Sequence, residues 1–343
     1  MQGENHKAVV DQLKRPLQDL RISVTDRCNF RCVYCMPSEI FGPDYPFLKE
    51  KMLLNNQEIV QVAKSFSQLG VNKIRITGGE PLMRKDLTQL VGALSKIEGI
   101  TDIAMTTNGS LLRSKAKELK MSGLNRVTVS LDSLNDETFG QINGRGFKVQ
   151  TVLKGIEAAK EAGLEVKVNM LVKRGVNEDE VIPMARYFQG SGHVLRFIEF
   201  MDVGNTNGWK MDDVVTRKQI LNLLQQEFSL KPIDANYFGE VATRYVNEDT
   251  GDEIGIISSI SGPFCSSCTR ARLSADGKIY TCLFATKGTD LRGPMRNGAT
   301  EADILKIIEQ TWENRVDQYS ALRTKETVAA RSKEKIEMSY IGG

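Results

Sequence analysis

The sequence lacks a hydrophobic run of the kind that crosses a membrane. A membrane-spanning helix needs roughly 18 consecutive apolar residues, and no uncharged apolar run in the 343 residues reaches that length. The first twenty residues carry several charged side chains and no apolar core, unlike a signal peptide. We therefore expect a soluble, cytoplasmic protein with no membrane partner.

An excess of charge of either sign is also missing. The 46 Lys and Arg residues and 43 Asp and Glu residues leave a formal net charge of +3, so nothing in the bulk charge favours nucleic acid as a partner. The hydrophobic fraction of 41% and the charged fraction of 26% are typical of globular proteins and exclude a disordered, collagen-like or coiled-coil chain. The length suggests about two domains, or one large α/β barrel with an appendage.

Histidine is scarce, whereas cysteine is grouped. The chain has two histidines, and its six cysteines form a C-x3-C-x2-C motif and a C-x2-C-x13-C motif. In a reducing compartment such groups indicate metal sites before they indicate disulfides. The candidate ligands are Cys28, Cys32 and Cys35, here called the first triad, and Cys265, Cys268 and Cys282, the second triad.

Three thiols and no histidine in each triad do not complete the four ligands of a structural zinc site. A [4Fe–4S] cluster normally takes four thiolates, so three thiolates would leave one iron open for another ligand. Two such clusters explain the count best. Zinc sites completed by distant carboxylates, and thiols that serve only packing, stay open as alternatives.

Short β-like runs alternate with amphipathic helical stretches between residues 20 and 228. The expected strands are 20–25, 73–78, 102–108, 126–132, 165–172 and 193–201, and the expected helices are 56–69, 86–97, 111–121, 151–162 and 178–188. Such βα units form parallel strands with right-handed crossovers, and six units are fewer than the eight of a closed barrel. The sequence therefore predicts an α/β fold, a partial (β/α)6 TIM-type barrel formed by residues 1–228 together with an N-terminal extension.

The βα rhythm stops near residue 229. Candidate strands at 240–246, 253–258, 270–273 and 278–283 surround the second triad, and a helix is expected at 301–313. We expect residues 229–343 to form a C-terminal α+β subdomain that closes the open side of the barrel.

Polar side chains alternate with apolar ones on the expected strands, which places one polar set on the inner face. Four cations belong to this set: Arg21, Arg75, Lys167 and Arg196. Burying several cations is costly unless an anion joins them, and arginine suits phosphate oxygens. Each arginine alone could instead pair with a nearby acid, and an antiparallel sheet with one wet face is the structural alternative.

The first triad lies in the segment CNFRCVYC, with Tyr34 directly before the third cysteine. This segment resembles the cluster loop of radical S-adenosylmethionine (SAM) enzymes, and TGGEP at 77–81 resembles the GGEP motif of the same superfamily. The resemblance implies a partial barrel, a first cluster whose open iron binds SAM, and reductive cleavage of SAM to methionine and a 5′-deoxyadenosyl radical.

The two triads, GGEP, the TRAR segment 269–272 and the final Gly-Gly together are similar to one family, the radical SAM cyclases that act on GTP in the first step of molybdenum cofactor biosynthesis. The similarity extends over about residues 15–343. It implies SAM contacts at Tyr34, Gly79, Ser130 and Met201. It implies GTP contacts at Arg21, Arg75, Thr106, Lys167, Arg196, Arg270, Ala271 and Arg272, and catalytic roles for Arg270, Arg272, Gly342 and Gly343.

The reaction implied by this resemblance joins C3′ of the GTP ribose to C8 of guanine after hydrogen abstraction from C3′. Two [4Fe–4S] clusters and SAM are the implied cofactors, and the second cluster's open iron binds the guanine edge. The implied partners are an electron donor such as flavodoxin or ferredoxin and the cyclic pyranopterin monophosphate synthase that takes the product; a homodimer is compatible with it. The alternatives are a two-cluster radical SAM enzyme with another substrate, such as a peptide, and a non-enzymatic zinc-binding module.

Overall fold

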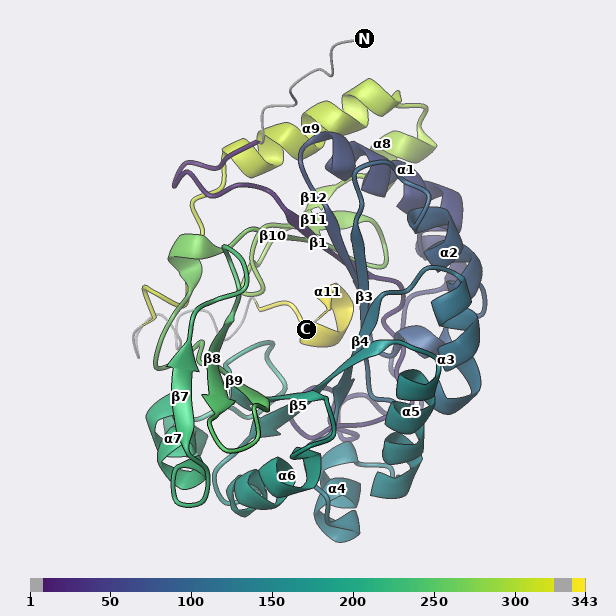
Figure 1. The fold of residues 1–343 in the computed structure, drawn as a ribbon. Coiled ribbons are helices and arrows are strands. Elements are labelled where there is room, and N and C mark those ends of the chain that lie inside the picture. The colour runs from purple at the N-terminus through teal and green to yellow at the C-terminus, as the bar shows by residue number, and fades with distance from the viewer. Residues whose placement is uncertain (1–8, 324–334, 343) are drawn as a thin grey trace.

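The computed structural model describes residues 9–323 and 335–342 of the chain. Its centre is a 12-stranded sheet that curves around a central space, with the strand order β12-β11-β10-β1-β2-β3-β4-β5-β6-β9-β8-β7 (Figure 1). The sheet has two edges, β12 and β7, and therefore remains open. A partial barrel of the predicted type is confirmed.

Six parallel strands form the middle of this sheet, and helices return along its outside (Figure 1). The strands are β1 (Asp19–Ser23), β2 (Lys73–Thr77), β3 (Asp102–Thr107), β4 (Arg126–Ser130), β5 (Glu165–Val172) and β6 (Val194–Glu199). The helices between them are α1 (Asn56–Gln68), α2 (Leu87–Leu94), α3 (Leu112–Met121), α4 (Asp136–Asn143), α5 (Val149–Glu161) and α6 (Val181–Phe188). All six predicted strands are present, whereas α4 was not predicted.

The alternation in β5 shows how the sequence positions these strands. Val166 and Val168 are buried in the hydrophobic core that lies beneath the helices. Lys167 and Asn169 lie on the other face and line a central cavity. Because side chains on a strand alternate between faces, the same sequence builds the core on one side and a polar interior on the other.

Strands from the C-terminal part extend the sheet at both sides. Next to β6 come β9 (Glu253–Ile257), β8 (Ala242–Asn247) and β7 (Leu230–Ile233); next to β1 come β10 (Arg270–Leu273), β11 (Lys278–Tyr280) and β12 (Thr289–Asp290). β9 pairs with β6 and β10 pairs with β1, both in parallel. One sheet therefore contains strands from both sides of residue 228. The division into domains 1–228 and 229–343 stays a proposal.

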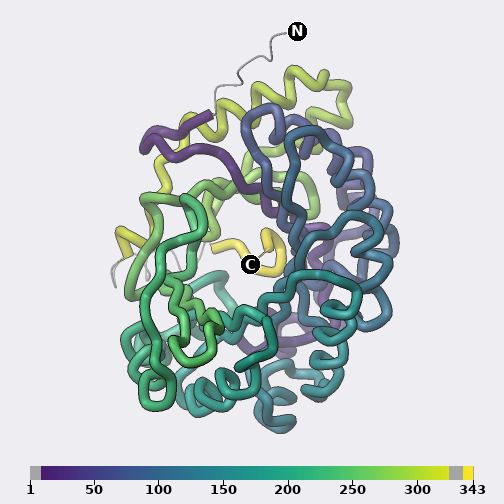
Figure 2. The backbone as a smooth tube through the Cα atoms, in the orientation of Figure 1, coloured from purple at the N-terminus to yellow at the C-terminus, as the bar shows by residue number. Residues whose placement is uncertain are grey.

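The other helices within residues 9–323 and 335–342 are short, apart from one. They are α7 (Arg217–Leu224), α8 (Arg292–Arg296), α9 (Glu301–Glu313) and α11 (Met338–Ile341), with 3-10 turns η1 (Glu50–Met52), η2 (Pro81–Met83), η3 (Glu178–Glu180), η4 (Met211–Asp213) and η5 (Cys265–Ser267). α9 confirms the helix expected at 301–313 and packs against α1. Figure 2 shows the C-terminal segment curling inside the ring of strands.

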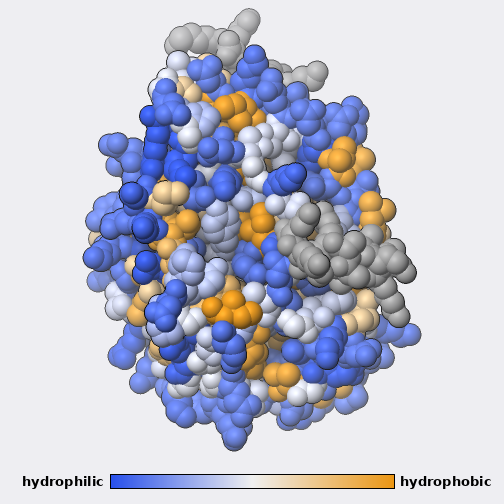
Figure 3. All heavy atoms as spheres, turned by 180° about the vertical axis from the view of Figure 1, so that it is seen from behind, coloured by the Kyte–Doolittle hydropathy of each residue, from blue (hydrophilic) through white to orange (hydrophobic). Residues whose placement is uncertain are grey.

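Hydrophilic residues cover most of the face seen in Figure 3, and the hydrophobic residues there form small separate groups. Across residues 9–323 and 335–342, no helix is long and apolar enough to span a membrane.

Candidate active site

A central cavity of about 320 Å³ lies inside the sheet and is lined by every cysteine of both triads. The first triad belongs to the loop after β1, whereas the second is divided between η5 just before β10 and the loop after β11. All six cysteines are free thiols and half-buried. The fold thus brings together two motifs that are more than 200 residues apart in the sequence.

The first triad is held in a tight loop. The Cys35 amide donates to the Cys32 carbonyl at 2.9 Å, and the Phe30 amide and the Asn108 side chain point at Cys28 Sγ from 3.4 and 3.8 Å. Burial raises the pKa of Cys28 to about 12, with Glu80 adding to the rise. For Cys32, burial and then the neighbouring sulfurs of Cys28 and Cys35 raise the pKa. Because burial and the neighbouring thiols disfavour thiolates here, a cationic group is needed to stabilise them.

The TGGEP segment packs directly against this loop. A Cβ atom on Gly79 would lie 2.2 Å from the Arg27 carbonyl oxygen, and one on Gly78 would lie 2.5 Å from the Thr25 carbonyl oxygen, with φ +149° at Gly78. Glycine is therefore required at both positions. The buried carboxylate of Glu80 accepts hydrogen bonds from the Thr107 hydroxyl and the Asn108 amide, each at 2.7 Å.

Three of the predicted SAM contacts line the cavity beside Gly79: Tyr34, Ser130 and Met201. The Tyr34 hydroxyl donates to Asp132 at 2.7 Å, and the same carboxylate accepts the Leu171 amide at 2.9 Å. Burial raises the pKa of Asp132 to about 6, although these hydrogen bonds oppose the rise. Tyr34 is thus fixed across the barrel, from the first-triad loop to the end of β4.

Two buried arginines support the second triad. The Arg315 guanidinium donates to Cys268 Sγ at 3.1 Å and to the Cys268 carbonyl at 2.8 Å. Arg15 donates to the Cys265 carbonyl at 2.8 Å, and both arginines pair with the buried carboxylate of Asp11. Burial alone would raise the pKa of Cys268, but Arg270 and Arg315 together lower it to about 6.

The predicted substrate cations converge on the same cavity. Within the described part of the chain, no carboxylate lies within 4.0 Å of Arg21, Arg75, Arg196, Arg270 or Arg272. Arg75 points at the hydroxyls of Thr106 and Thr128 from 3.4 and 3.5 Å. Lys167 differs, because its ammonium lies 3.4 Å from Glu165.

Burial lowers the pKa of Arg21, Arg196 and Arg272, and repulsion from neighbouring arginines lowers it further. The pKa of Arg21 falls well below its ordinary value through burial and then through Arg272 and Arg75. Burial followed by Arg75 lowers the pKa of Arg196 to about 9, and burial followed by Arg270 lowers that of Arg272 to about 10. A polyanion placed among them would relieve this repulsion.

The TRAR segment and the C-terminal segment meet at this cluster. Arg272 donates to the Gly342 carbonyl, and a Cβ atom on Gly342 would lie 2.1 Å from Thr77 Cγ2. Arg270 donates to the Gly239 carbonyl at 3.0 Å. The Ala271 side chain belongs to the hydrophobic core, so only its backbone can face a ligand. Gly343 lies outside the described residues.

Some cavity residues were not predicted from the sequence. Tyr237 lines the cavity, with the Lys73 ammonium 3.2 Å from its ring centroid. Because Lys73 is the first residue of β2, this pair lies at the end of the barrel opposite the first triad. The loop that carries Tyr237 contains no recognisable motif, so the sequence offered no local reason to predict Tyr237 as a cavity residue.

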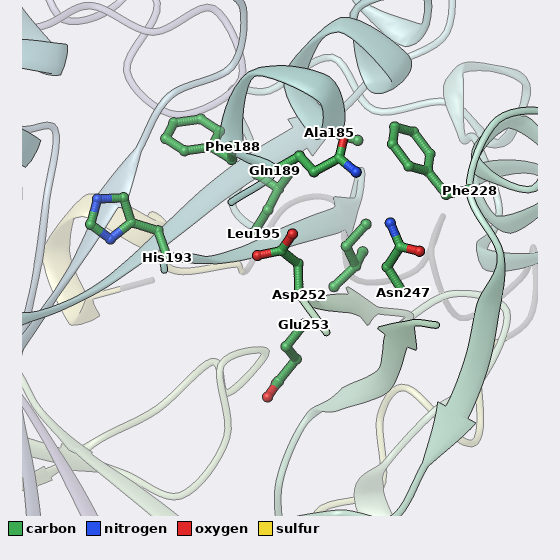
Figure 4. A pocket seen from close by; sticks show the side chains of 10 residues that line it. Ala185, Phe188, Gln189, His193, Leu195, Phe228, Asn247, Asp252 and Glu253 are labelled. Atoms are coloured by element: carbon green, nitrogen blue, oxygen red, sulfur yellow. The ribbon is translucent and has the colours of Figure 1, made fainter. Parts of the chain in front are cut away.

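A second, small pocket lies beside α6 and is lined by His193 and Phe188 among others (Figure 4). Its volume is about 10 Å³, room for one water molecule at most. It contains no cysteine. The chemistry of this chain is therefore expected in the central cavity.

The donor set of the triads fits iron–sulfur clusters better than single metal ions. Among the residues that the structure describes, no three His, Cys, Asp or Glu side chains are grouped so that they could hold one metal ion. In a cluster each thiolate binds a different iron, so the sulfurs stand apart and accept hydrogen bonds. The N–H donors at Cys28, Cys268 and Cys282 match that pattern.

An open parallel barrel with a cysteine triad after its first strand defines a radical SAM enzyme. In agreement, residues 22–188 match the Radical SAM superfamily profile, and residues 193–321 match the Molybdenum Cofactor Synthesis C profile. The Streptococcus suis SuiB structure with bound precursor peptide SuiA has a similar fold, with a TM-score of 0.61 at 14% identity, covering 91% of this chain and 68% of SuiB.

Curated relatives are more similar by far. The GTP 3′,8-cyclase of Staphylococcus epidermidis is 51% identical over 338 residues, covering 98% of this chain and 99% of the relative. The enzymes of the same name from Staphylococcus carnosus and Staphylococcus aureus are each 50% identical, with the same coverage. The chain belongs to the GTP 3′,8-cyclase family.

Proposed function

We propose that this protein converts GTP to (8S)-3′,8-cyclo-7,8-dihydroguanosine 5′-triphosphate, the first step of molybdenum cofactor biosynthesis. The observation that carries the proposal is a group of cavity arginines that have no carboxylate partner among residues 9–323 and 335–342, in a cavity that both triads also line. The triphosphate supplies the missing negative charge, and family membership points to the same substrate.

We assign the first triad to a [4Fe–4S] cluster with SAM beside Tyr34, Gly79, Ser130 and Met201, and the second triad to a cluster that faces the guanine. When bound, these groups supply the one-electron chemistry that removes hydrogen from C3′ of the ribose. Every other task falls to the protein. The arginines hold the triphosphate, and binding energy gained far from the reacting carbons aligns C3′ with C8.

The C-terminal segment closes the cavity between the two triads. Met338 and Ser339 line it, and Gly342 reaches Arg272. We assign Gly342 and Gly343 to the catalytic machinery; the contact of Gly342 with Arg272 supports this role, and exclusion of water from the space where C3′ and C8 must meet is the task we assign to the segment.

The partners of this reaction are also proposals. A flavodoxin or ferredoxin supplies electrons, and cyclic pyranopterin monophosphate synthase receives the product. The six free thiols suit the reducing cytoplasm, and a homodimer is compatible with this scheme.

Isotope transfer tests the proposal directly. The anaerobically reconstituted protein is incubated with SAM, a reductant and GTP deuterated at C3′. Deuterium should appear in 5′-deoxyadenosine, and the cyclised nucleotide should accumulate in parallel. If 5′-deoxyadenosine carries no label, the abstraction site is wrong. If peptides compete with GTP for binding, the substrate class is wrong.

A further inference from the structure

The C-terminal segment is fastened to the loop that follows β6. The Glu337 carboxylate accepts the Asn205 amide on Oε1 and the Thr206 hydroxyl on Oε2, both at 2.9 Å. Glu337 precedes α11 yet makes no side-chain capping bond to that helix. Its charge is therefore directed at the loop and not at its own helix.

The loop is shaped to receive this carboxylate. Gly204 has φ +72°, and a Cβ atom there would lie 2.4 Å from Glu337 Oε2. Any larger residue would both strain the backbone and push the carboxylate away. The Asn205 side chain also donates to the Lys335 carbonyl.

A buried charge reinforces the attachment. The Asp202 side chain is fully buried, and the Lys335 ammonium donates to the Asp202 carbonyl at 3.0 Å and lies 3.6 Å from its carboxylate. Arg323 pairs with the same carboxylate at 3.0 Å. Two cations from the C-terminal part of the chain thus converge on one acid beside Met201.

Met338 and Ser339, which follow Glu337 directly, line the cavity, and Gly342 comes one helical turn later. Met338 packs with Met201 and Cys282 around the same hydrophobic cluster, and Gly342 then contacts Arg272 and Thr77. A shift of the segment by one residue would remove Gly342 from Arg272.

We propose that Glu337 and the loop 202–206 form a latch that fixes the register of the C-terminal segment, and that Glu337 is a positioning residue for the cyclisation. The proposal rests on the proposed function. It adds a structural connection between two parts of the site. One is the loop that begins next to Met201, a proposed SAM contact, and the other is the C-terminal segment that contacts Arg272.

Hydrogen–deuterium exchange of the reconstituted protein tests the latch. Glu337→Ala removes both acceptors, Thr206→Val removes one donor, and Gly204→Ala acts from the loop side. Each should accelerate amide exchange in residues 335–342, by about tenfold for Glu337→Ala, since a hydrogen bond to a charged group is lost. Glu337→Gln, which keeps one acceptor oxygen, should lie in between. Glu157→Ala, an exposed glutamate on α5, is the matched control and should change nothing.

Kinetics provide the second readout. In Glu337→Ala, kcat for GTP should fall about tenfold or more because alignment is lost, while the KM for GTP and the iron content should stay as in the wild type. Unchanged exchange in all three latch variants overturns the latch, and faster exchange with unchanged kcat overturns the positioning role. If the wild type does not cyclise GTP, the proposed function fails, whereas the exchange comparison still decides whether the latch exists.

Discussion

Arg75 lies in the middle of β2 with only the hydroxyls of Thr106 and Thr128 as hydrogen-bond partners among the described residues. Arg75→Ala should weaken GTP binding about 10- to 100-fold, the range expected for losing a charge-assisted hydrogen bond. Reductive SAM cleavage should survive, because the first triad is untouched. Anaerobic calorimetry measures the affinity, and Arg113→Ala on the exposed side of α3 is the control. An unchanged GTP affinity would remove Arg75 from the substrate site.

Glu80 is fully buried, and burial raises its pKa from 4.5 to about 7 although three hydrogen bonds oppose the rise. Because the folded protein disfavours the ionised form, Glu80 lowers stability progressively as the pH rises from about 4.5 to about 7. Glu80→Gln should abolish this part of the pH dependence, while the lost acceptor makes the variant less stable at low pH. Thermal unfolding between pH 5 and 8 measures the slope, with the exposed Glu98→Gln as control. A slope equal to that of the wild type would contradict the prediction.

At the scale of elements, the TGGEP turn packs closely against the first-triad loop and fixes its position. Gly79→Ala should force the turn from the Arg27 carbonyl, which lies 2.2 Å from the new Cβ, and destabilise the protein by about 1–3 kcal/mol. Iron uptake by the first triad and the Tm should both fall. Gly92→Ala in α2, where the nearest atom to the new Cβ is 3.9 Å away, should leave both unchanged. Normal iron uptake in Gly79→Ala would show that the loop does not depend on this contact.

The strands of the barrel could be predicted closely because their apolar and polar residues alternate, and β2, β4 and β5 also follow a glycine at the end of a helix, at Gly70, Gly123 and Gly163. α4 and α7 were missed although their start signals are present: Asn135 caps two amides of α4, and Thr216 forms a capping box with Gln219. Each of these two helices buries only two apolar side chains, so the apolar periodicity is weak. Local patterns also could not predict that β9 and β10 join β6 and β1, because such pairings depend on contacts between distant segments.

The same limit applies to the site. The cysteines and the cavity arginines could be predicted because motif spacing and strand alternation are local properties. Arg15 and Arg315 were not singled out, since Arg15 reaches Cys265 across 250 residues and Arg315 reaches Cys268 across 47. Tyr237 was missed for the same reason, because only the fold brings it next to Lys73.

At the scale of the whole molecule, the two triads face one cavity, and their occupancy can be counted. After anaerobic reconstitution the wild type should contain about eight irons and eight sulfides per chain, as two [4Fe–4S] clusters require. Cys32→Ala and Cys268→Ala should each contain about four of both, which makes each variant the other's control. Reductive SAM cleavage should be lost in Cys32→Ala and kept in Cys268→Ala.

These variants distinguish the roles of the two triads. Tyr34 lies within the first-triad loop, and Gly79 lies in the turn that packs against that loop. SAM cleavage retained by Cys32→Ala would mean that the first triad does not bind the SAM cluster. Zinc without sulfide in the wild type would mean that neither triad binds a cluster. A wild-type content near four irons would leave the second triad without one and would shift guanine recognition to the arginines and to the C-terminal segment, where Arg272 already contacts Gly342.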